Sequence, residues 1–228
     1  MKMILPSVLL IFIFLACAGN STEPDSECTI LEQDSHPHPD SLLLQNVNIE
    51  HLPECVYDRK NLRIIVMVNN NLKSVPDNID KLENLGVFFV SENDFSKLPS
   101  GFLKLNKIEF LVISGNPLKE IPDNIGDLTT LEHLALPQTE ISEVPESIGN
   151  LSKLKYLSLS DTNVESLPES IGNLTSLFNL DLKFCPISSI PESIKNLKDN
   201  LEYLNLTETN ITDKQKDTLR TWLPNTQL

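Results

Sequence analysis

Residues 154–176 read LKYLSLSDTNVESLPESIGNLTS, and the neighbouring segments of the chain align with this stretch without a gap. Each segment places apolar residues at the same positions and a proline in the same phase. These prolines are 23 residues apart: Pro53, Pro76, Pro99, Pro122, Pro145, Pro168 and Pro191. A fixed period of this length predicts a solenoid, because one coil alone cannot bury its apolar residues and must stack on its neighbours.

Within each coil the spacing of apolar residues changes once. Leu157 and Leu159 alternate with polar residues, which predicts a short strand with both leucines pointing inward. After the proline, Ile171 and Leu174 are three residues apart, which indicates a helical or 3-10 turn. An acidic residue follows most of the prolines, as Glu169 does, and suits the first turn of a short helix.

The pattern L-x-x-L-x-L-x-x-N-x-L-x-x-L-P-x-x-I-x-x-L resembles the leucine-rich repeat family and covers about residues 42–211. It is most similar to the 23-residue repeats of exported bacterial proteins, particularly those of Leptospira-like spirochaetes. The resemblance implies an α/β leucine-rich repeat solenoid, curved, with a parallel sheet on the concave face and short helical or 3-10 turns on the convex face. It also implies surface display and binding of a host or matrix protein, and it places Asn70, Asn93, Asn116 and a buried, inert Cys185 in one inward column.

Residues 1–18 are predicted to be a signal peptide, since Lys2 precedes an apolar run that is too short to span a bilayer comfortably. The sequence Phe14-Leu15-Ala16-Cys17 resembles a bacterial lipobox, which would make Cys17 the lipidated first residue of an outer-membrane lipoprotein. Ala16-Cys17-Ala18 also fits ordinary cleavage and secretion. A secreted eukaryotic protein stays open as well, because the chain has N-x-S/T triplets such as that of Asn150.

The remaining chain is predicted to have three parts. Residues 19–40 form a polar spacer or N-terminal cap, residues 41–211 about eight repeats, and residues 212–228 a C-terminal cap. Asn200 is an insertion that starts the last strand one residue late, and a helix over residues 213–222 places Trp222 over the end of the core. Cys28 and Cys55 flank the first repeat, and the sequence leaves open whether a disulfide joins them.

The sequence contains no recognisable catalytic or phosphate-binding motif, so we expect neither an enzyme nor a cofactor. The formal net charge of -14 argues against a nucleic-acid partner. His36 and His38 form a weak candidate metal site beside carboxylates, but their spacing matches no closed site and a solvated loop is favoured.

The strand positions that face outward are apolar in the first repeats and polar in the later ones. We expect the apolar ones to form a patch large enough to be a protein contact, with aromatic anchors and a polar rim. The predicted partner-binding residues are Ile64, Val66, Val68, Val87, Phe89, Phe110, Val112, His133, Tyr156, Asp181 and Tyr203. Three interpretations of this patch stay open: docking of another protein, self-association as a homodimer or structural envelope protein, and cover by residues 27–40 of the same chain.

Overall fold

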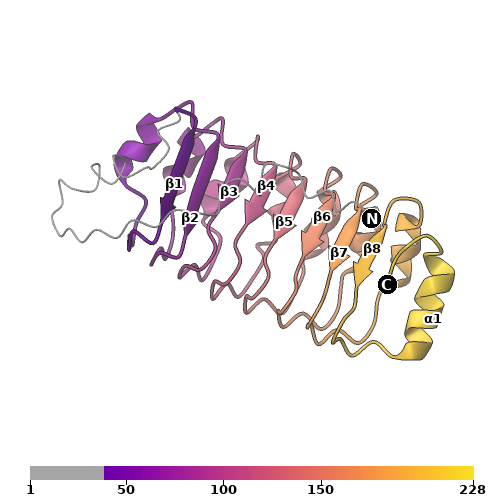
Figure 1. The fold of residues 1–228 in the computed structure, drawn as a ribbon. Coiled ribbons are helices and arrows are strands. Elements are labelled where there is room, and N and C mark those ends of the chain that lie inside the picture. Colours follow the sequence, from indigo (N-terminus) through magenta and orange to yellow (C-terminus); the bar gives the residue numbers. More distant parts are fainter. Residues whose placement is uncertain (1–38) are drawn as a thin grey trace.

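The computed structural model describes residues 39–228, which form one elongated solenoid (Figure 1). Eight parallel strands lie side by side in chain order in a single sheet, as the repeat predicts. The strands are β1 (Ser41–Gln45), β2 (Ile64–Val68), β3 (Val87–Phe89), β4 (Phe110–Val112), β5 (His133–Ala135), β6 (Tyr156–Ser158), β7 (Asn179–Asp181) and β8 (Tyr203–Asn205).

Short 3-10 helices form the other side of the coils, behind the sheet in Figure 1. They are η3 (Glu54–Asp58), η4 (Asp77–Lys81), η5 (Ser100–Lys104), η6 (Ile125–Asp127), η7 (Glu146–Asn150), η8 (Glu169–Asn173) and η9 (Glu192–Leu197). All but η6 begin directly after a repeat proline, whose carbonyl accepts the first turn's hydrogen bond, as Pro168 O does from Ile171 N at 3.1 Å. Proline suits this position because its fixed φ is compatible with the start of a helix. Proline also lacks an N–H, and nothing is lost by this because N–H groups at the start of a helix have no partner within the helix.

The core lies between the sheet and the 3-10 helices. Leu134, Leu157 and Leu180 pair in register on β5, β6 and β7 and are fully buried, as are the isoleucines of the 3-10 helices such as Ile171. Each column is therefore a continuous apolar strip through the stack, which confirms the predicted inward positions.

The predicted inward column of asparagines is also present, and it satisfies buried backbone groups. Asn93 donates from Nδ2 to Met67 O and Ser91 O, both at 2.9 Å, and accepts from Leu72 N at 3.1 Å. In later coils Thr162 donates to Leu159 O at 2.7 Å, and the Cys185 thiol reaches the same carbonyl at 2.9 Å. Burial raises the pKa of the Cys185 thiol, and hydrogen bonds with Thr162 oppose part of that effect, so the thiol is held neutral and enclosed.

The C-terminal end of the stack is closed by α1 (Asp213–Trp222) and the residues after it (Figure 1). Asn179 pairs with Tyr203, 24 residues later, which confirms the predicted one-residue shift. Thr212 and Gln215 form a capping box at the start of α1, and half-buried Trp222 packs against the core. Gln227 O accepts from Leu204 N at 2.9 Å and so covers part of the exposed edge of β8. Within residues 39–228, no helix combines the length and the apolar character that crossing a bilayer requires.

Candidate interaction surface

The open face of the sheet, opposite the 3-10 helices, is built from strand residues that alternate with the core leucines. Strand register lines these residues up in columns that run along the solenoid. One column is Ile64, Val87, Phe110, His133, Tyr156, Asn179 and Tyr203, and the next is Leu43, Val66, Phe89, Val112, Ala135, Ser158, Asp181 and Asn205. The predicted binding residues therefore lie on one face, and the columns change from apolar to polar along the chain.

The first half of the open face carries what we call the apolar patch: Ile64, Val66, Val68, Val87, Phe89, Phe110 and Val112. Register brings six of these into direct cross-strand pairs over β2, β3 and β4, and Val68 lies at the end of β2. Each is half-buried, because neighbouring parallel strands about 4.8 Å apart shield one another's side chains. The patch is continuous, and part of every side chain in it remains in contact with solvent.

An aromatic ladder continues the patch across the middle of the sheet. The ring of His133 stacks on Phe110 at a centroid distance of 4.4 Å and an interplanar angle of 15°, and on Tyr156 at 5.8 Å and 24°. Burial lowers the pKa of His133, Lys155 lowers it further, and Glu132 acts in the opposite direction. The imidazole is therefore held in its neutral form, which favours stacking between two rings over charge pairing.

Beyond Tyr156 the open face becomes polar. Asp181 accepts a 3.4 Å hydrogen bond from the Ser158 hydroxyl, and burial together with the Asp181 charge raises the pKa of Tyr156. Tyr203 does not join the ladder, because Asn179 lies between it and Tyr156 in the register. It contacts Phe178 instead, with ring centroids 5.3 Å apart, so these two exposed rings form a separate pair.

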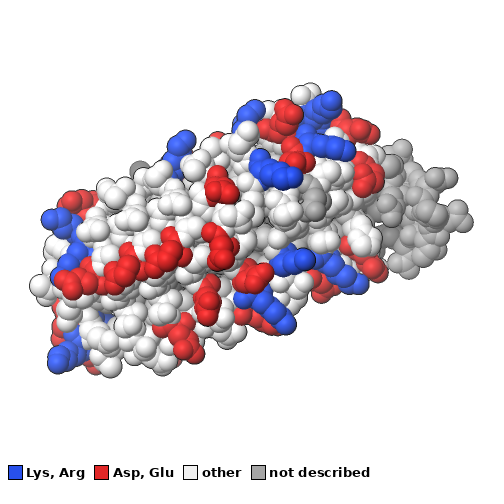
Figure 2. Space-filling view, turned by 180° about the vertical axis from the view of Figure 1, so that it is seen from behind, with Lys and Arg blue, Asp and Glu red and all other residues white. Residues whose placement is uncertain are grey.

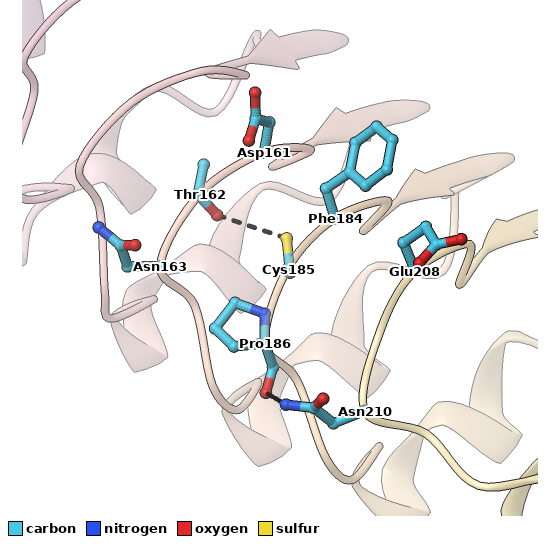
Figure 3. Close-up of a pocket in the computed structure, with 8 residues that line it drawn as sticks. All are labelled: Asp161, Thr162, Asn163, Phe184, Cys185, Pro186, Glu208 and Asn210. Atoms are coloured by element: carbon cyan, nitrogen blue, oxygen red, sulfur yellow. Dashed lines mark hydrogen bonds between the residues drawn. The ribbon is translucent and has the colours of Figure 1, made fainter.

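A hollow of about 400 Å³ lies where the strands of the later coils end, and no sequence prediction included it (Figure 3). Its lining residues are Asp161, Thr162, Asn163, Phe184, Cys185, Pro186, Glu208 and Asn210. Phe184 is 50% exposed, the largest value among the large hydrophobic residues that the structure describes. The sequence does carry a signal for this residue. Earlier coils have polar residues or glycine at the position equivalent to Phe184, so an aromatic residue there breaks the pattern: Asn69, Glu92, Gly115, Gln138 and Asp161.

The rear of the solenoid is acidic toward its C-terminal end. Figure 2 shows a row of acidic side chains on that surface, with more lysine and arginine toward the other end. Exposed acids begin the first turns of the late 3-10 helices, at Glu146, Glu169 and Glu192. Such a row is ordinary for a solvated helical face, and we assign no site to it.

Comparison with known proteins agrees with this architecture. A sequence model described as "Leucine-rich repeat region" matches residues 145–220, and the same repeat continues in register through all eight strands. The fold of the chain is a leucine-rich repeat solenoid. Among curated proteins, none matches this leucine-rich repeat chain.

Solved structures share the fold of this leucine-rich repeat protein. A Leptospira interrogans LRR protein is 28% identical with a TM-score of 0.67, over 82% of this chain and 54% of that one. A TDR receptor has the same identity and TM-score over 75% of this chain and 31% of the receptor. A third structure is the LRR ectodomain of the plant membrane receptor kinase GASSHO1/SCHENGEN3 from Arabidopsis thaliana, solved in complex with CASPARIAN STRIP INTEGRITY FACTOR 2. It is 24% identical with a TM-score of 0.57, over 76% of this chain and 24% of that one. The chain thus spans about half of the Leptospira structure and less of the receptors.

Several predicted site residues of this leucine-rich repeat protein lie outside the described residues: Cys17, Cys28, His36 and His38. The described Cys55 is half-buried in η3 and is disulfide-bonded, but the identity of its partner as Cys28 stays a prediction. Among residues 39–228, no group of three or more potential ligands is arranged to hold a metal ion. The segment 27–40, expected as one cover for the apolar patch, is described only at Pro39 and Asp40.

Proposed function

We propose that this protein is a non-enzymatic binding module whose open face docks another protein. The observation that carries the proposal is the apolar patch, which joins seven partly exposed apolar side chains over three adjacent strands. A continuous surface of this kind on a folded domain marks a contact site more often than it serves the fold.

The rest of the open face supports the same proposal. Phe89 and Phe110 offer aromatic anchors, and the His133 and Tyr156 rings extend them toward the polar residues Ser158 and Asp181. Rigid aromatic residues at the centre of a contact with polar groups at its margin are the usual composition of an energetically important interface. The likeness to a receptor adds support, since leucine-rich repeat proteins typically serve as binding modules.

The test compares partner capture by the wild-type chain with capture by two charge-introducing variants. Phe89→Glu places a carboxylate in the apolar patch without touching a core column, and Ser166→Glu places one at an exposed position outside the strands. A partner retained by the wild type and by Ser166→Glu but lost by Phe89→Glu supports the proposal. Equal retention by all three proteins would exclude the open face as the contact.

A second candidate function is self-association as a structural envelope protein, which the same apolar patch favours. Two copies could bury their patches against each other in a two-fold dimer. Light scattering on the full chain distinguishes the two: a dimer that Phe89→Glu converts to a monomer supports self-association, and a monomeric wild type rules it out at the concentration tested.

We propose further that the protein is exported and either lipid-anchored through Cys17 or secreted, with a host or matrix protein as the partner class. The support is the N-terminal sequence and the likeness to a Leptospira leucine-rich repeat protein. Mass spectrometry of the mature chain separates the two forms, because an anchored protein begins at a lipid-modified Cys17 and a secreted one begins further on, unmodified.

A further inference from the structure

Phe184 is held in a backbone conformation that aromatic residues rarely adopt. Its φ is 63°, in the left-handed region that glycine and asparagine enter readily. The left-handed φ belongs to this turn in every coil, since the equivalent residues have φ values between 53° and 62°: Asn69, Glu92, Gly115, Gln138, Asp161 and Glu208. The turn therefore does not require an aromatic residue, and half of the Phe184 side chain remains exposed. An unfavourable conformation at an exposed aromatic residue points to a role outside folding.

Two carboxylates flank this ring on the neighbouring coils. Asp161 N donates to Lys183 O at 2.7 Å and Phe184 N donates to Thr207 O at 2.9 Å, so the turns that carry Asp161, Phe184 and Glu208 stack directly on one another. Figure 3 shows the three side chains on successive coils, with the Phe184 ring projecting away from Cys185. In the part of the chain that the structure describes, neither Asp161 nor Glu208 has an ion-pair partner.

The lining of the hollow offers acceptors and few free donors. Thr162 donates to Leu159 O, Asn163 donates to Glu140 O at 3.4 Å, and Asn210 donates to Pro186 O at 2.9 Å. Within residues 39–228, no hydrogen bond ends on the Oδ1 atoms of Asn163 and Asn210 or on the side-chain carboxylates of Asp161 and Glu208. A donor-rich cation is the ligand that such a lining satisfies.

One cation already lies beside the ring. Lys183 Nζ is 4.5 Å from the Phe184 ring centroid, within the range of a cation–π contact. The ring can therefore hold positive charge, although this lysine belongs to the open face and is not among the residues that line the hollow.

We propose that this hollow binds the guanidinium group of an arginine side chain presented by another protein. The planar group stacks on Phe184, and its fork of donors pairs with the carboxylates of Asp161 and Glu208. The inference does not rest on docking at the apolar patch, since the hollow lies beyond the ends of β6, β7 and β8 and can be tested alone.

The test uses a small probe on the full chain. N-acetyl-arginine methylamide is titrated while the amide resonances of Asn163, Phe184, Glu208 and Asn210 are followed by NMR, beside the citrulline analogue, which has the same shape without the charge. We expect saturable shifts at these amides for the arginine probe and at least about tenfold weaker binding of the citrulline probe, as a charge-assisted pair requires. Equal binding of both probes, or no saturable shift with arginine, would overturn the proposal.

Variants of the lining residues test whether the hollow binds a positively charged ligand. Phe184→Ala and the pair Asp161→Asn with Glu208→Gln should each weaken arginine binding about fivefold or more, while the control Glu165→Gln, outside the lining, should leave it unchanged. Lys183→Met should strengthen binding about two- to fivefold, because the ring loses its competing cation. Weaker binding by Lys183→Met would instead show that the lysine holds an anion there and would refute the assignment.

Discussion

Gly149 is the residue whose replacement tests the stacking of the coils most directly. It lies in η7, and a Cβ at this position would be 2.6 Å from Ser170 O and 2.7 Å from Ser170 Cβ in the next coil. Both distances are shorter than side-chain carbons tolerate, and the atoms met belong to the backbone and its first side-chain carbon, which cannot rotate away. We therefore expect Gly149→Ala to force η7 and η8 apart.

The size of the effect follows from two opposing contributions. Overpacking in a close-packed interior costs about 1–3 kcal/mol. Replacing glycine by alanine also restricts the unfolded chain, which returns about 0.4–1 kcal/mol. The net loss is then on the order of 1–2 kcal/mol, or a fall in melting temperature of about 2–8 °C for a domain of this size.

Gly86→Ala is the matched control. A Cβ there would meet nothing closer than Lys107 O at 3.6 Å, which is an ordinary contact. The remaining effect is the restriction of the unfolded chain, which raises the free energy of unfolding. Thermal unfolding followed by circular dichroism should show the two alanine variants moving in opposite directions from the wild type. If Gly149→Ala melted at or above the wild-type temperature, or if Gly86→Ala lost as much stability, the close approach of the coils would not be the reason for glycine in these turns.

Three further outcomes can be measured. Leu134→Ala should lower the free energy of unfolding by about 2–5 kcal/mol in denaturant melts, because it empties one position of a stacked core column. Asn93→Ala should cost about 2–4 kcal/mol by removing the side-chain partner of Leu72 N and Met67 O, while Ser91 O keeps its bond from Asn69 N, and Asn93→Thr should cost less. Stability should fall as the pH drops through the ordinary histidine range near 6.5, since the lowered pKa of His133 makes the unfolded chain take up the proton first. His133→Gln should remove part of that loss, and an unchanged pH profile would contradict the neutral, stacked imidazole.

The repeat made the architecture predictable in detail. Inward positions such as Leu157 and Leu159 follow from period-2 alternation, and the one-residue shift at Asn200 could be counted directly. The open-face positions followed from the same alternation, so the membership of the apolar patch was predictable before its geometry was known. Each of these statements depends only on position within a coil, which a fixed 23-residue period transfers from one coil to the next.

The features that escaped prediction depend on side-chain conformation and on the ends of strands. The sequence did not indicate that His133 stacks between Phe110 and Tyr156, because ring orientation is set by neighbours on both sides. Tyr156 and Tyr203 were both predicted binding residues, and the sequence did not indicate that Tyr203 contacts Phe178 while Asn179 separates it from Tyr156. Phe184 was not predicted because the sequence analysis followed the core columns and the outward strand positions, whereas alignment of its own column shows an aromatic residue where earlier coils carry polar residues or glycine.

The apolar patch and the hollow beside Phe184 can be tested as parts of one contact through additivity. Phe89 lies on β3 and Asp161 follows the end of β6, three strand spacings of about 4.8 Å away, which is roughly 14 Å. Residues this far apart without shared neighbours change binding independently, so the losses from Phe89→Glu and Asp161→Asn should add within about 0.5 kcal/mol when one rigid partner contacts both. A partner whose binding is weakened by Phe89→Glu but not by Asp161→Asn reaches only the patch. In that case the arginine probe would still bind the hollow, and the two surfaces would serve different ligands.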